Sequence, residues 1–198
     1  YTYLYNMRKK IKYGIIGAGV MGQEHIHNIN IIDNAEVVAV CDTNETSINQ
    51  ARLIIKDPAN FYNNIEDLIS NNIADAYIIA TPNFSHIDIL ERILKTNKHL
   101  LVEKPLCTTT KDCKKFEILS KNYSKIIWTG MEYRYMPPVK QLIEEIRNNT
   151  IGQIKMLSIR EHRFPFLHKV NDWNRFAINT GGTLVEKCCH FFDLMRLV

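Results

Sequence analysis

The sequence predicts an α/β fold built on a doubly wound parallel sheet, followed by the start of an α+β domain. Three observations predict it. An apolar run at residues 12–16 leads directly into Gly-Ala-Gly-Val-Met-Gly at 17–22, strand and helix patterns then alternate as far as residue 147, and the alternation stops after Gly152. Because parallel strands need a helical crossover between them, such alternation is typical of a parallel sheet with helices on both faces.

The alternating part divides into short buried strands and amphipathic helices. Glu-Val-Val-Ala-Val-Cys at 36–41 and Ala-Tyr-Ile-Ile-Ala at 76–80 are mainly apolar runs, typical of strands buried on both faces. Asn44 and Ser85 are expected to cap the helices that follow these strands, and Pro58 ends the first of those helices. The expected strands are 12–16, 36–41, 76–80, 99–102 and 126–129, and the expected helices are 20–32, 45–55, 64–70, 86–96, 109 or 110 to 120, and 139–147.

The pattern changes near residue 151. Residues 153–162 alternate polar and apolar side chains, like a strand with one face in water, and 163–180 is polar and aromatic, like a loop. Gly181-Gly182 opens a last expected helix at 183–198. Because one strand cannot form a stable sheet alone, we expect only the beginning of a second domain. The predicted division is an N-terminal extension at 1–9, an α/β domain at 10–150 and an incomplete domain at 151–198.

Composition excludes several classes of function. The chain has 198 residues and a net charge of +4, with basic and acidic residues interspersed, so we expect no nucleic-acid partner. No apolar run approaches the roughly 18 residues of a membrane helix, and the N-terminus does not resemble a signal peptide. The five cysteines show no Cys-x-x-Cys pair, which favours a reducing compartment. The expected location is the cytoplasm.

The glycine run Gly17, Gly19, Gly22 has the spacing of a dinucleotide-binding loop between a strand and a helix. One glycine permits the tight turn, one lets a pyrophosphate approach the backbone, and one lets helix and strand pack closely. Taken alone, three glycines can also be an ordinary turn. Asp42 follows Gly22 by 20 residues at the end of the second strand, where a carboxylate accepts hydrogen bonds from the adenosine ribose. Together these features predict a Rossmann domain.

The predicted cofactor is NAD, with NADP disfavoured. The Asp42 carboxylate would repel the 2′-phosphate of NADP, and the next residues, Thr43 and Asn44, provide no arginine to bind that phosphate. Asp42 could also serve only as a loop residue that caps the following helix.

Three further segments carry a resemblance. The sequences Ile-Ala-Thr-Pro-Asn-Phe-Ser-His (79–86), Lys-His-Leu-Leu-Val-Glu-Lys-Pro-Leu (98–106) and Gly-Gly-Thr-Leu-Val-Glu-Lys-Cys-Cys-His-Phe-Phe-Asp (181–193) resemble the signatures of the Gfo/Idh/MocA oxidoreductases. The resemblance runs from about residue 10 to the end. It implies a Rossmann domain, a C-terminal α+β domain with an open sheet, and NAD(P)-dependent oxidation or reduction of a hydroxyl or carbonyl on a sugar, cyclitol or related small molecule.

The resemblance implies the cofactor residues one by one. Asn83 and its neighbours would contact the cofactor near its ribose, although the same residues could be only a helix-start turn. Glu103 would hold the nicotinamide half. The implied cofactor-binding residues are Gly17, Ala18, Gly19, Val20 and Met21 at the pyrophosphate, Gly22, Asp42, Thr81, Pro82 and Asn83, with His86 close behind them, and Glu103 and Lys104.

The resemblance also implies the catalytic groups Lys104, Glu186 and His190. Lys104 would face the reacting hydroxyl and either take its proton or stay charged and polarise the oxygen. His190 would exchange a proton with the substrate, with Glu186 one helical turn earlier to orient it. The family more often has Asp at 186, so the role of the longer side chain is open. The i, i+4 pair could also suggest a metal site, but no third ligand is suitably spaced, and we expect no metal.

The resemblance places substrate contacts at Arg134, Trp173 and Asn174. Polar groups beside a tryptophan suit a polyol or sugar, although 162–174 could also be a plain solvent loop. Glu132 replaces the Asn expected before the Arg134 segment. The expected function is an NAD(P)-dependent dehydrogenase acting on CH–OH groups, with a homo-oligomer expected for a full-length form. The alternative is a dinucleotide-binding protein without turnover, or an inactive fragment that lacks the C-terminal sheet.

Overall fold

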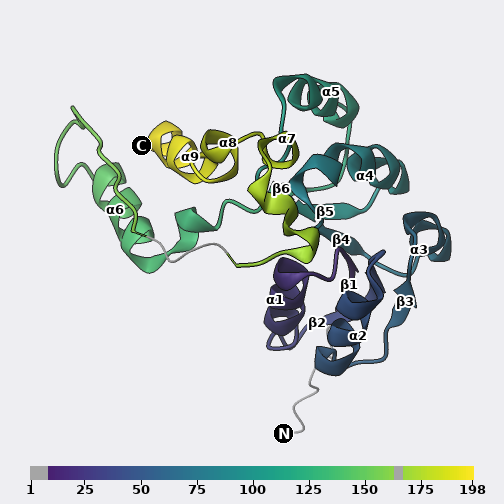
Figure 1. The fold of residues 1–198 in the computed structure, drawn as a ribbon. Helices are drawn as coiled ribbons and strands as arrows, with labels where there is room; N and C mark the ends of the chain where they lie inside the picture. Colours follow the sequence, from purple (N-terminus) through teal and green to yellow (C-terminus); the bar gives the residue numbers. More distant parts are fainter. Residues whose placement is uncertain (1–8, 163–166) are drawn as a thin grey trace, which may run out of the picture.

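The structure, a computed structural model, describes residues 9–162 and 167–198. Its centre is a six-stranded parallel sheet in the order β3-β2-β1-β4-β5-β6 (Figure 1). This is the strand order of a doubly wound dinucleotide-binding sheet, so the predicted fold class is confirmed. The strands are β1 (Ile11–Ile16), β2 (Ala35–Cys41), β3 (Asn60–Tyr62), β4 (Ala76–Ile79), β5 (His99–Val102) and β6 (Ile127–Thr129).

Helices connect the strands and begin where the sequence provides caps. The Asn44 side chain accepts a hydrogen bond from the Ser47 N–H, and Thr109 accepts one from the Asp112 N–H. The helices are α1 (Val20–Ile29), α2 (Glu45–Ile54), α3 (Ile65–Asn71), α4 (His86–Ile93), α5 (Thr110–Ser120), α6 (Pro137–Arg147), α7 (Ala177–Thr180), α8 (Thr183–Glu186) and α9 (Cys189–Leu197), with the 3₁₀ turns η1 (Asn83–Ser85), η2 (Leu94–Thr96), η3 (Glu132–Tyr135) and η4 (Val170–Arg175).

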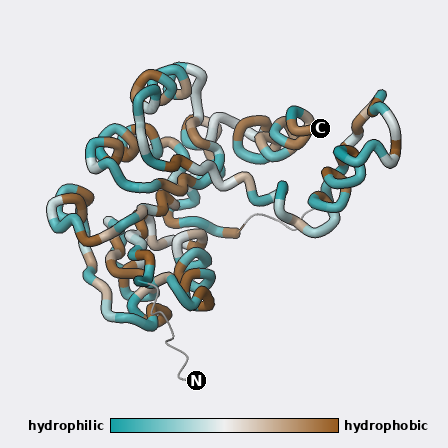
Figure 2. Tube along the Cα trace, turned by 180° about the vertical axis from the view of Figure 1, so that it is seen from behind, coloured by the Kyte–Doolittle hydropathy of each residue, from teal (hydrophilic) through white to brown (hydrophobic). Residues whose placement is uncertain are grey.

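The two faces of the sheet build two separate apolar cores. Successive strand residues point to opposite faces, so Ile15 packs on one side with Ile26 of α1, while Ile16 packs on the other with Leu68 of α3 and Leu90 of α4. Helices α1 and α2 therefore cover one face, and α3 and α4 cover the other (Figure 1). Apolar colour follows the central strands in Figure 2. This double burial explains why the strand sequences are continuous apolar runs.

The second part of the chain differs from its prediction in two places. Residues 153–162 form no strand or helix, because the alternating pattern finds no partner strand among the described residues and a single strand is not stable. The described part of the expected loop at 163–180 instead contains η4 and α7. In the first part, the short strand β3 was not predicted, since Asn-Phe-Tyr is too brief to give a periodic signal.

The helix expected at 183–198 is broken into α8 and α9. The carbonyl of Thr183 accepts hydrogen bonds from the N–H groups of both Lys187 and Cys188, at 2.9 and 3.3 Å. The second of these spans five residues, so the helical repeat is interrupted there. A small third core of Tyr133, Ile143 and Leu194 joins α9 to η3 and α6. Helix α6 itself lies apart from the sheet (Figures 1 and 2).

Candidate functional site

One large cavity follows the carboxyl edge of the sheet. It has a volume of about 1710 Å³. Asp42 lines it after β2, Gly17 after β1, Thr81 after β4, and Glu103 and Lys104 after β5. Residues of the second part, among them Trp173 and Glu186, line the same cavity. In open α/β sheets, ligands bind at this edge, where the strand order reverses between β1 and β4.

The glycine loop fits a closely approaching phosphate group. A Cβ on Gly17, which has φ +93°, would lie 2.7 Å from the backbone of Ala80, and a Cβ on Gly22 would lie 1.9 Å from the Gly17 carbonyl oxygen. At Gly19, by contrast, no heavy atom of the described residues lies within 4 Å of the same position. Gly17 and Gly22 therefore allow close packing behind the loop, and Gly19 faces open space in the cavity.

Asp42 joins the glycine loop to the end of β2. One carboxylate oxygen accepts a hydrogen bond of 2.6 Å from the Ala18 N–H, and the other accepts one of 2.8 Å from the Asn44 N–H. A carboxylate has further lone pairs, so Asp42 can still face a ribose in the cavity. Ala18 is fully buried and its N–H is occupied. The expected contact of Ala18 with the pyrophosphate stays a prediction, and in this structure the Ala18 N–H is already bound by Asp42.

His86 holds two segments of the cavity wall together. Its Nδ1 lies 3.0 Å from the Pro105 carbonyl oxygen and its Nε2 lies 3.1 Å from that of Thr81. Burial lowers the pKa of His86, although the backbone carbonyls of Thr81 and Pro105 oppose this. The side chain has no exposed surface. His86 was expected close behind the cofactor-binding residues; in this position it can act on a cofactor by holding these two segments, and that role stays a prediction.

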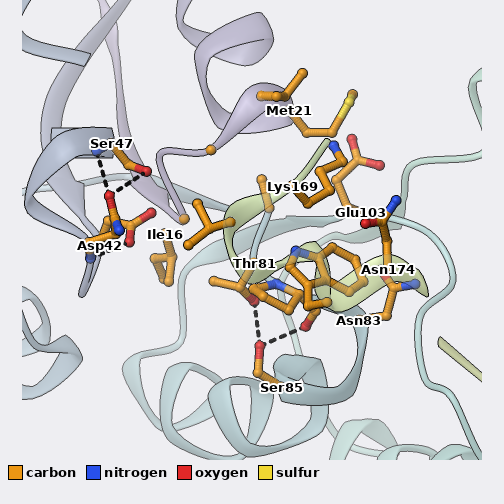
Figure 3. Close-up of a pocket in the computed structure, with 18 of the residues that line it drawn as sticks. Ile16, Met21, Asp42, Ser47, Thr81, Asn83, Ser85, Glu103, Lys169 and Asn174 are labelled. Atoms are coloured by element: carbon orange, nitrogen blue, oxygen red, sulfur yellow. Dashed lines mark hydrogen bonds between the residues drawn. The ribbon is translucent and has the colours of Figure 1, made fainter. Parts of the chain in front are cut away.

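Ser85 supports the same segment instead of capping α4. Its hydroxyl donates to the Pro82 carbonyl oxygen at 2.7 Å and is hydrogen-bonded to the Thr81 hydroxyl at 2.9 Å (Figure 3). The expected cap is absent from Ser85 because its hydroxyl is used in this turn. The turn keeps Thr81 at the cavity edge.

Two buried amide groups at the cavity have unused hydrogen-bonding capacity. The Nδ2 of Asn83 and the Oδ1 of Asn174 have no partner among the described residues. Both residues line the cavity and lie near each other in Figure 3. Buried polar groups are normally satisfied, so an unpaired donor and an unpaired acceptor at one cavity fit a polar ligand. The predicted residues Asn83 and Asn174 are thus brought together from the two parts of the chain.

Protein groups hold the Glu103 carboxylate in place without a ligand. Its carboxylate lies 2.8 Å from His25 Nε2, and it accepts a hydrogen bond of 3.3 Å from the Lys104 N–H. Burial raises the pKa of Glu103, but the hydrogen bond and charge of His25 and the neighbouring Lys104 outweigh burial and hold the pKa below the ordinary glutamate value. Sequence reasoning missed His25, because nothing in the spacing connects α1 with the end of β5.

Replacement of Glu103 by glutamine is expected to change how the free energy of unfolding depends on pH under acidic conditions. A carboxyl whose pKa is depressed in the folded state stabilises the fold above its unfolded pKa, and this contribution is lost as the pH falls through the folded value. The free energy of unfolding of the wild type in urea should therefore fall as the pH drops below the ordinary glutamate pKa of about 4.3. Glu103→Gln should be less stable than the wild type at pH 6, and its stability should change less as the pH is lowered. Glu117→Gln, on α5, is the control. If the free energy of unfolding falls equally with decreasing pH in the wild type and in Glu103→Gln, this assignment is contradicted.

Lys104 and Glu186 meet across the cavity from the two parts of the chain. The Lys104 ammonium donates a hydrogen bond of 3.1 Å to the Glu186 carbonyl oxygen. The Glu186 carboxylate lies 3.2 Å from the Lys187 ammonium. Both predicted catalytic residues line the cavity, as does Lys187, which sequence reasoning did not single out.

His190 is placed differently from the prediction. It is 2% exposed, stacks on Tyr133 with ring centroids 4.0 Å apart, and does not line the cavity. Its Nε2 lies 3.3 Å from the Glu132 carboxylate, which does line the cavity. In this conformation Glu132, the residue that departs from the family pattern, stands between His190 and the ligand space.

Arg134 holds α9 and does not face the cavity. Its Nε donates to the Asp193 carboxylate at 2.6 Å, and its Nη2 bonds the other oxygen of the same carboxylate. This two-point contact raises the pKa of Arg134, against the opposing effect of burial. The expected substrate contact at Arg134 stays a prediction, and in this structure the guanidinium joins η3 to α9.

Arg134→Ala is expected to loosen α9 without changing ligand affinity. Hydrogen bonds to charged groups contribute about 1.5–3 kcal/mol, and solvent screening reduces this because the Arg134 side chain is 38% exposed. The free energy of unfolding should therefore fall by about 1–2 kcal/mol, with faster proteolysis at α9. Arg196→Ala, an exposed position on the same helix, is the matched control. Equal proteolysis of both variants would remove the ion pair from this role.

Neither a cluster of metal ligands nor a membrane-spanning helix is present in the described residues. Across 9–162 and 167–198, no three His, Cys, Asp or Glu side chains gather as a metal ion would require. No helix in those ranges has the length and apolarity to cross a membrane.

The comparisons with known proteins match both parts of the chain. Residues 11–131 match the family model described as "Oxidoreductase family, NAD-binding Rossmann fold", and residues 143–198 match "Oxidoreductase family, C-terminal alpha/beta domain". Inositol 2-dehydrogenase from Salmonella typhimurium is 32% identical over 192 residues, which are 94% of this chain and 54% of that protein. Glucose-6-phosphate 3-dehydrogenase from Bacillus subtilis is 30% identical and is covered to 52%. The chain thus spans about half the length of these curated relatives.

Solved structures of inositol dehydrogenases are also similar to this chain. That of myo-inositol dehydrogenase from Lactobacillus casei in complex with NAD(H) and myo-inositol has a TM-score of 0.68 and 30% identity, covering 72% of this chain and 43% of that one. The structure of scyllo-inositol dehydrogenase from Lactobacillus casei with NAD(H) and scyllo-inositol has a TM-score of 0.79, covering 96% of this chain and 56% of that one. Because the two sequences are 20% identical, this match supports the fold alone. The two matched domains, in the order that the sequence motifs indicate, place this chain in the Gfo/Idh/MocA oxidoreductase family.

Proposed function

We propose that this chain provides the dinucleotide site and part of the active site of an NAD-dependent dehydrogenase that acts on a CH–OH group of a polyol, cyclitol or sugar. The observation that carries the proposal is the cavity shared by the glycine loop, Asp42 and Lys104. NAD, when bound, would accept or supply the hydride. The chain's own residues would bind the cofactor and substrate and handle the proton.

The two ends of the cavity suit the two ends of a dinucleotide. Asp42 lies at the end of β2, where a ribose diol would find its acceptor, and a 2′-phosphate would meet the same negative charge. The N-terminus of α1 opens at Gly19 without a side-chain cap, so its N–H groups can meet a pyrophosphate. Asn83 and Glu103 stand at the other end, where polar contacts would orient the nicotinamide.

Lys104 is the proposed group that handles the hydroxyl proton. It lines the cavity directly after β5 and is oriented by the Glu186 carbonyl oxygen. Held there, its ammonium can polarise a substrate oxygen, or accept the hydroxyl proton once it has lost its own. Glu186 and Glu132 are the acceptors that would bind neighbouring hydroxyls, and Trp173 and Asn174 would line the substrate's other side.

A polyol or sugar is proposed as substrate because of the kind of groups that line this end of the cavity. Carboxylates, an amide and an indole provide several hydrogen-bond acceptors and one flat apolar surface, which suits a ring with many hydroxyls. The relatives named as inositol dehydrogenases support the same class. The proposed domain division at 10–150 and 151–198 assigns the cofactor to the first part and most substrate contacts to the second.

Dinucleotide binding without turnover is the second candidate. One observation favours it: His190, the family's proton-transferring histidine, is buried away from the cavity in this conformation. Both candidates require NADH binding, and they differ only in turnover.

Two measurements test the proposal in order. Titration of the purified chain with NADH, followed by nicotinamide fluorescence, should saturate, and NADPH should bind at least about tenfold more weakly because of Asp42. Reduction of NAD⁺ is then followed with a panel of inositols and neutral sugars. Turnover with a member of the panel supports the dehydrogenase. NADH binding with no turnover supports the second candidate. If neither nucleotide binds, both candidates are ruled out.

A further inference from the structure

We propose that Lys169 is a further cofactor-binding residue, reaching from the second part of the chain to the pyrophosphate of the dinucleotide. This inference rests on the dinucleotide binding proposed above and deepens it. The glycine motif does not include Lys169, and neither do the segments that carry the family resemblance.

The position of Lys169 is the first observation. It directly precedes η4 and lines the same cavity as Gly19, Met21 and Glu103. Figure 3 shows its side chain between Met21, in the first turn of α1, and Glu103. The side chain therefore lies in the part of the cavity between the first turn of α1 and the end of β5, where the pyrophosphate would lead to the nicotinamide half.

The second observation concerns the acceptors available to this ammonium. Among the described residues, the side chain of Lys169 has no hydrogen bond or ion pair, although its backbone carbonyl accepts one of 2.8 Å from the Asp172 N–H. The nearby carboxylates are already engaged, since Glu103 bonds His25 at 2.8 Å and Glu186 pairs with Lys187 at 3.2 Å. A half-buried ammonium without an acceptor is costly, and an anion in the cavity would remove that cost.

The third observation is the charge of the glycine loop. A pyrophosphate carries two negative charges, but residues 17–23 include no Lys or Arg, so the loop provides only N–H groups. Asp42 occupies the N–H of Ala18 and adds a negative charge beside the loop. Side-chain positive charge for the pyrophosphate would therefore come from another segment, and Lys169 is a half-buried lysine of the same cavity that can provide it.

The electrostatic surroundings agree with an anion as the ligand. Burial lowers the pKa of Lys169, and the charges of Lys187 and Lys104 lower it further, against the opposing effect of Glu103 and Glu186. A site that disfavours the positive charge in the absence of ligand gains correspondingly when an anion arrives.

Titration with ADP-ribose and with adenosine tests the inference, because only the first carries the pyrophosphate. Lys169→Met removes the charge and keeps most of the stem, while Lys169→Arg keeps the charge. We expect Lys169→Met to weaken ADP-ribose and NADH binding at least about tenfold, with adenosine affinity unchanged, and Lys169→Arg to restore most of the loss. The resistance to urea should not fall in Lys169→Met, because no protein contact is lost. Lys155→Ala, which removes an exposed lysine charge, is the control and should bind like wild type.

The outcomes are separable. If the wild type binds neither ADP-ribose nor NADH, the proposed function itself fails. If the wild type binds both and Lys169→Met binds ADP-ribose equally well, the inference alone is overturned. A loss in Lys169→Met that appears with glucose 6-phosphate but not with ADP-ribose would also overturn it, because the anion would then belong to an acidic substrate.

Discussion

Lys104→Ala is expected to abolish most turnover while leaving cofactor affinity nearly intact. Loss of a positioned group that handles a proton lowers the rate by about 10²–10⁴-fold, and Lys104 lines the cavity with its ammonium fixed by the Glu186 carbonyl oxygen. The measurement is steady-state reduction of NAD⁺ in a form of this protein that turns over, combined with an NADH fluorescence titration. Lys95→Ala, an exposed lysine on η2, is the control.

A second substitution separates the two roles open to Lys104. Lys104→Arg keeps a positive charge but cannot act as a base, because a guanidinium stays protonated. If the lysine only polarises the substrate oxygen, Lys104→Arg should retain more turnover than Lys104→Ala; if it takes the proton, both should fall alike. Unchanged turnover in Lys104→Ala would remove this residue from the mechanism.

The second large effect is expected from a matched pair of glycine substitutions. A Cβ on Gly22 would lie 1.9 Å from the Gly17 carbonyl oxygen, so Gly22→Ala must displace the backbone of the loop or the helix. We expect a loss of stability at the upper end of the roughly 1–3 kcal/mol typical of overpacking. Urea unfolding measures it.

Gly19→Ala is the partner experiment. The backbone of Gly19, at φ −69° and ψ −165°, is open to any residue, and a Cβ there meets no described atom within 4 Å. Stability should change by less than about 1 kcal/mol, but the methyl group would occupy the space through which a pyrophosphate approaches, so NADH affinity should fall at least about tenfold. Wild-type affinity in Gly19→Ala would mean that the pyrophosphate does not sit on this loop.

The first half of the fold was predictable because its signals are local. Continuous apolar runs such as 36–41 mark strands buried on both faces, and Asn44 marks a helix start by its own side-chain chemistry. β3 gave no such signal, since three residues cannot show a period and its pairing with β2 provides the evidence instead. The strand expected at 153–162 was wrong for the complementary reason: its alternation is local, but a strand needs partners.

The site residues also divide into those predictable from local sequence signals and those placed by contacts between distant segments. Gly17, Asp42, Glu103 and Lys104 follow strand ends, and the carboxyl ends of parallel strands share one edge, so their meeting follows from the alternation alone. Arg134 and His190 were placed in the ligand space by motif, yet the structure commits Arg134 to Asp193 and stacks His190 on Tyr133. Those partners lie in other segments, and no sequence spacing relates them.

The sequence by itself determined the sheet, the glycine loop, the acid after β2 and the lysine after β5, because each depends on residues within one strand–turn–helix unit. Only the tertiary structure decided that His25 anchors Glu103, that His86 joins two cavity segments by their carbonyls, and that Lys169 lines the same cavity as the glycine loop. These are contacts between segments distant in sequence. The packing of the segments decides which partner a polar side chain contacts. Such contacts leave no periodic pattern in the sequence from which they could be predicted.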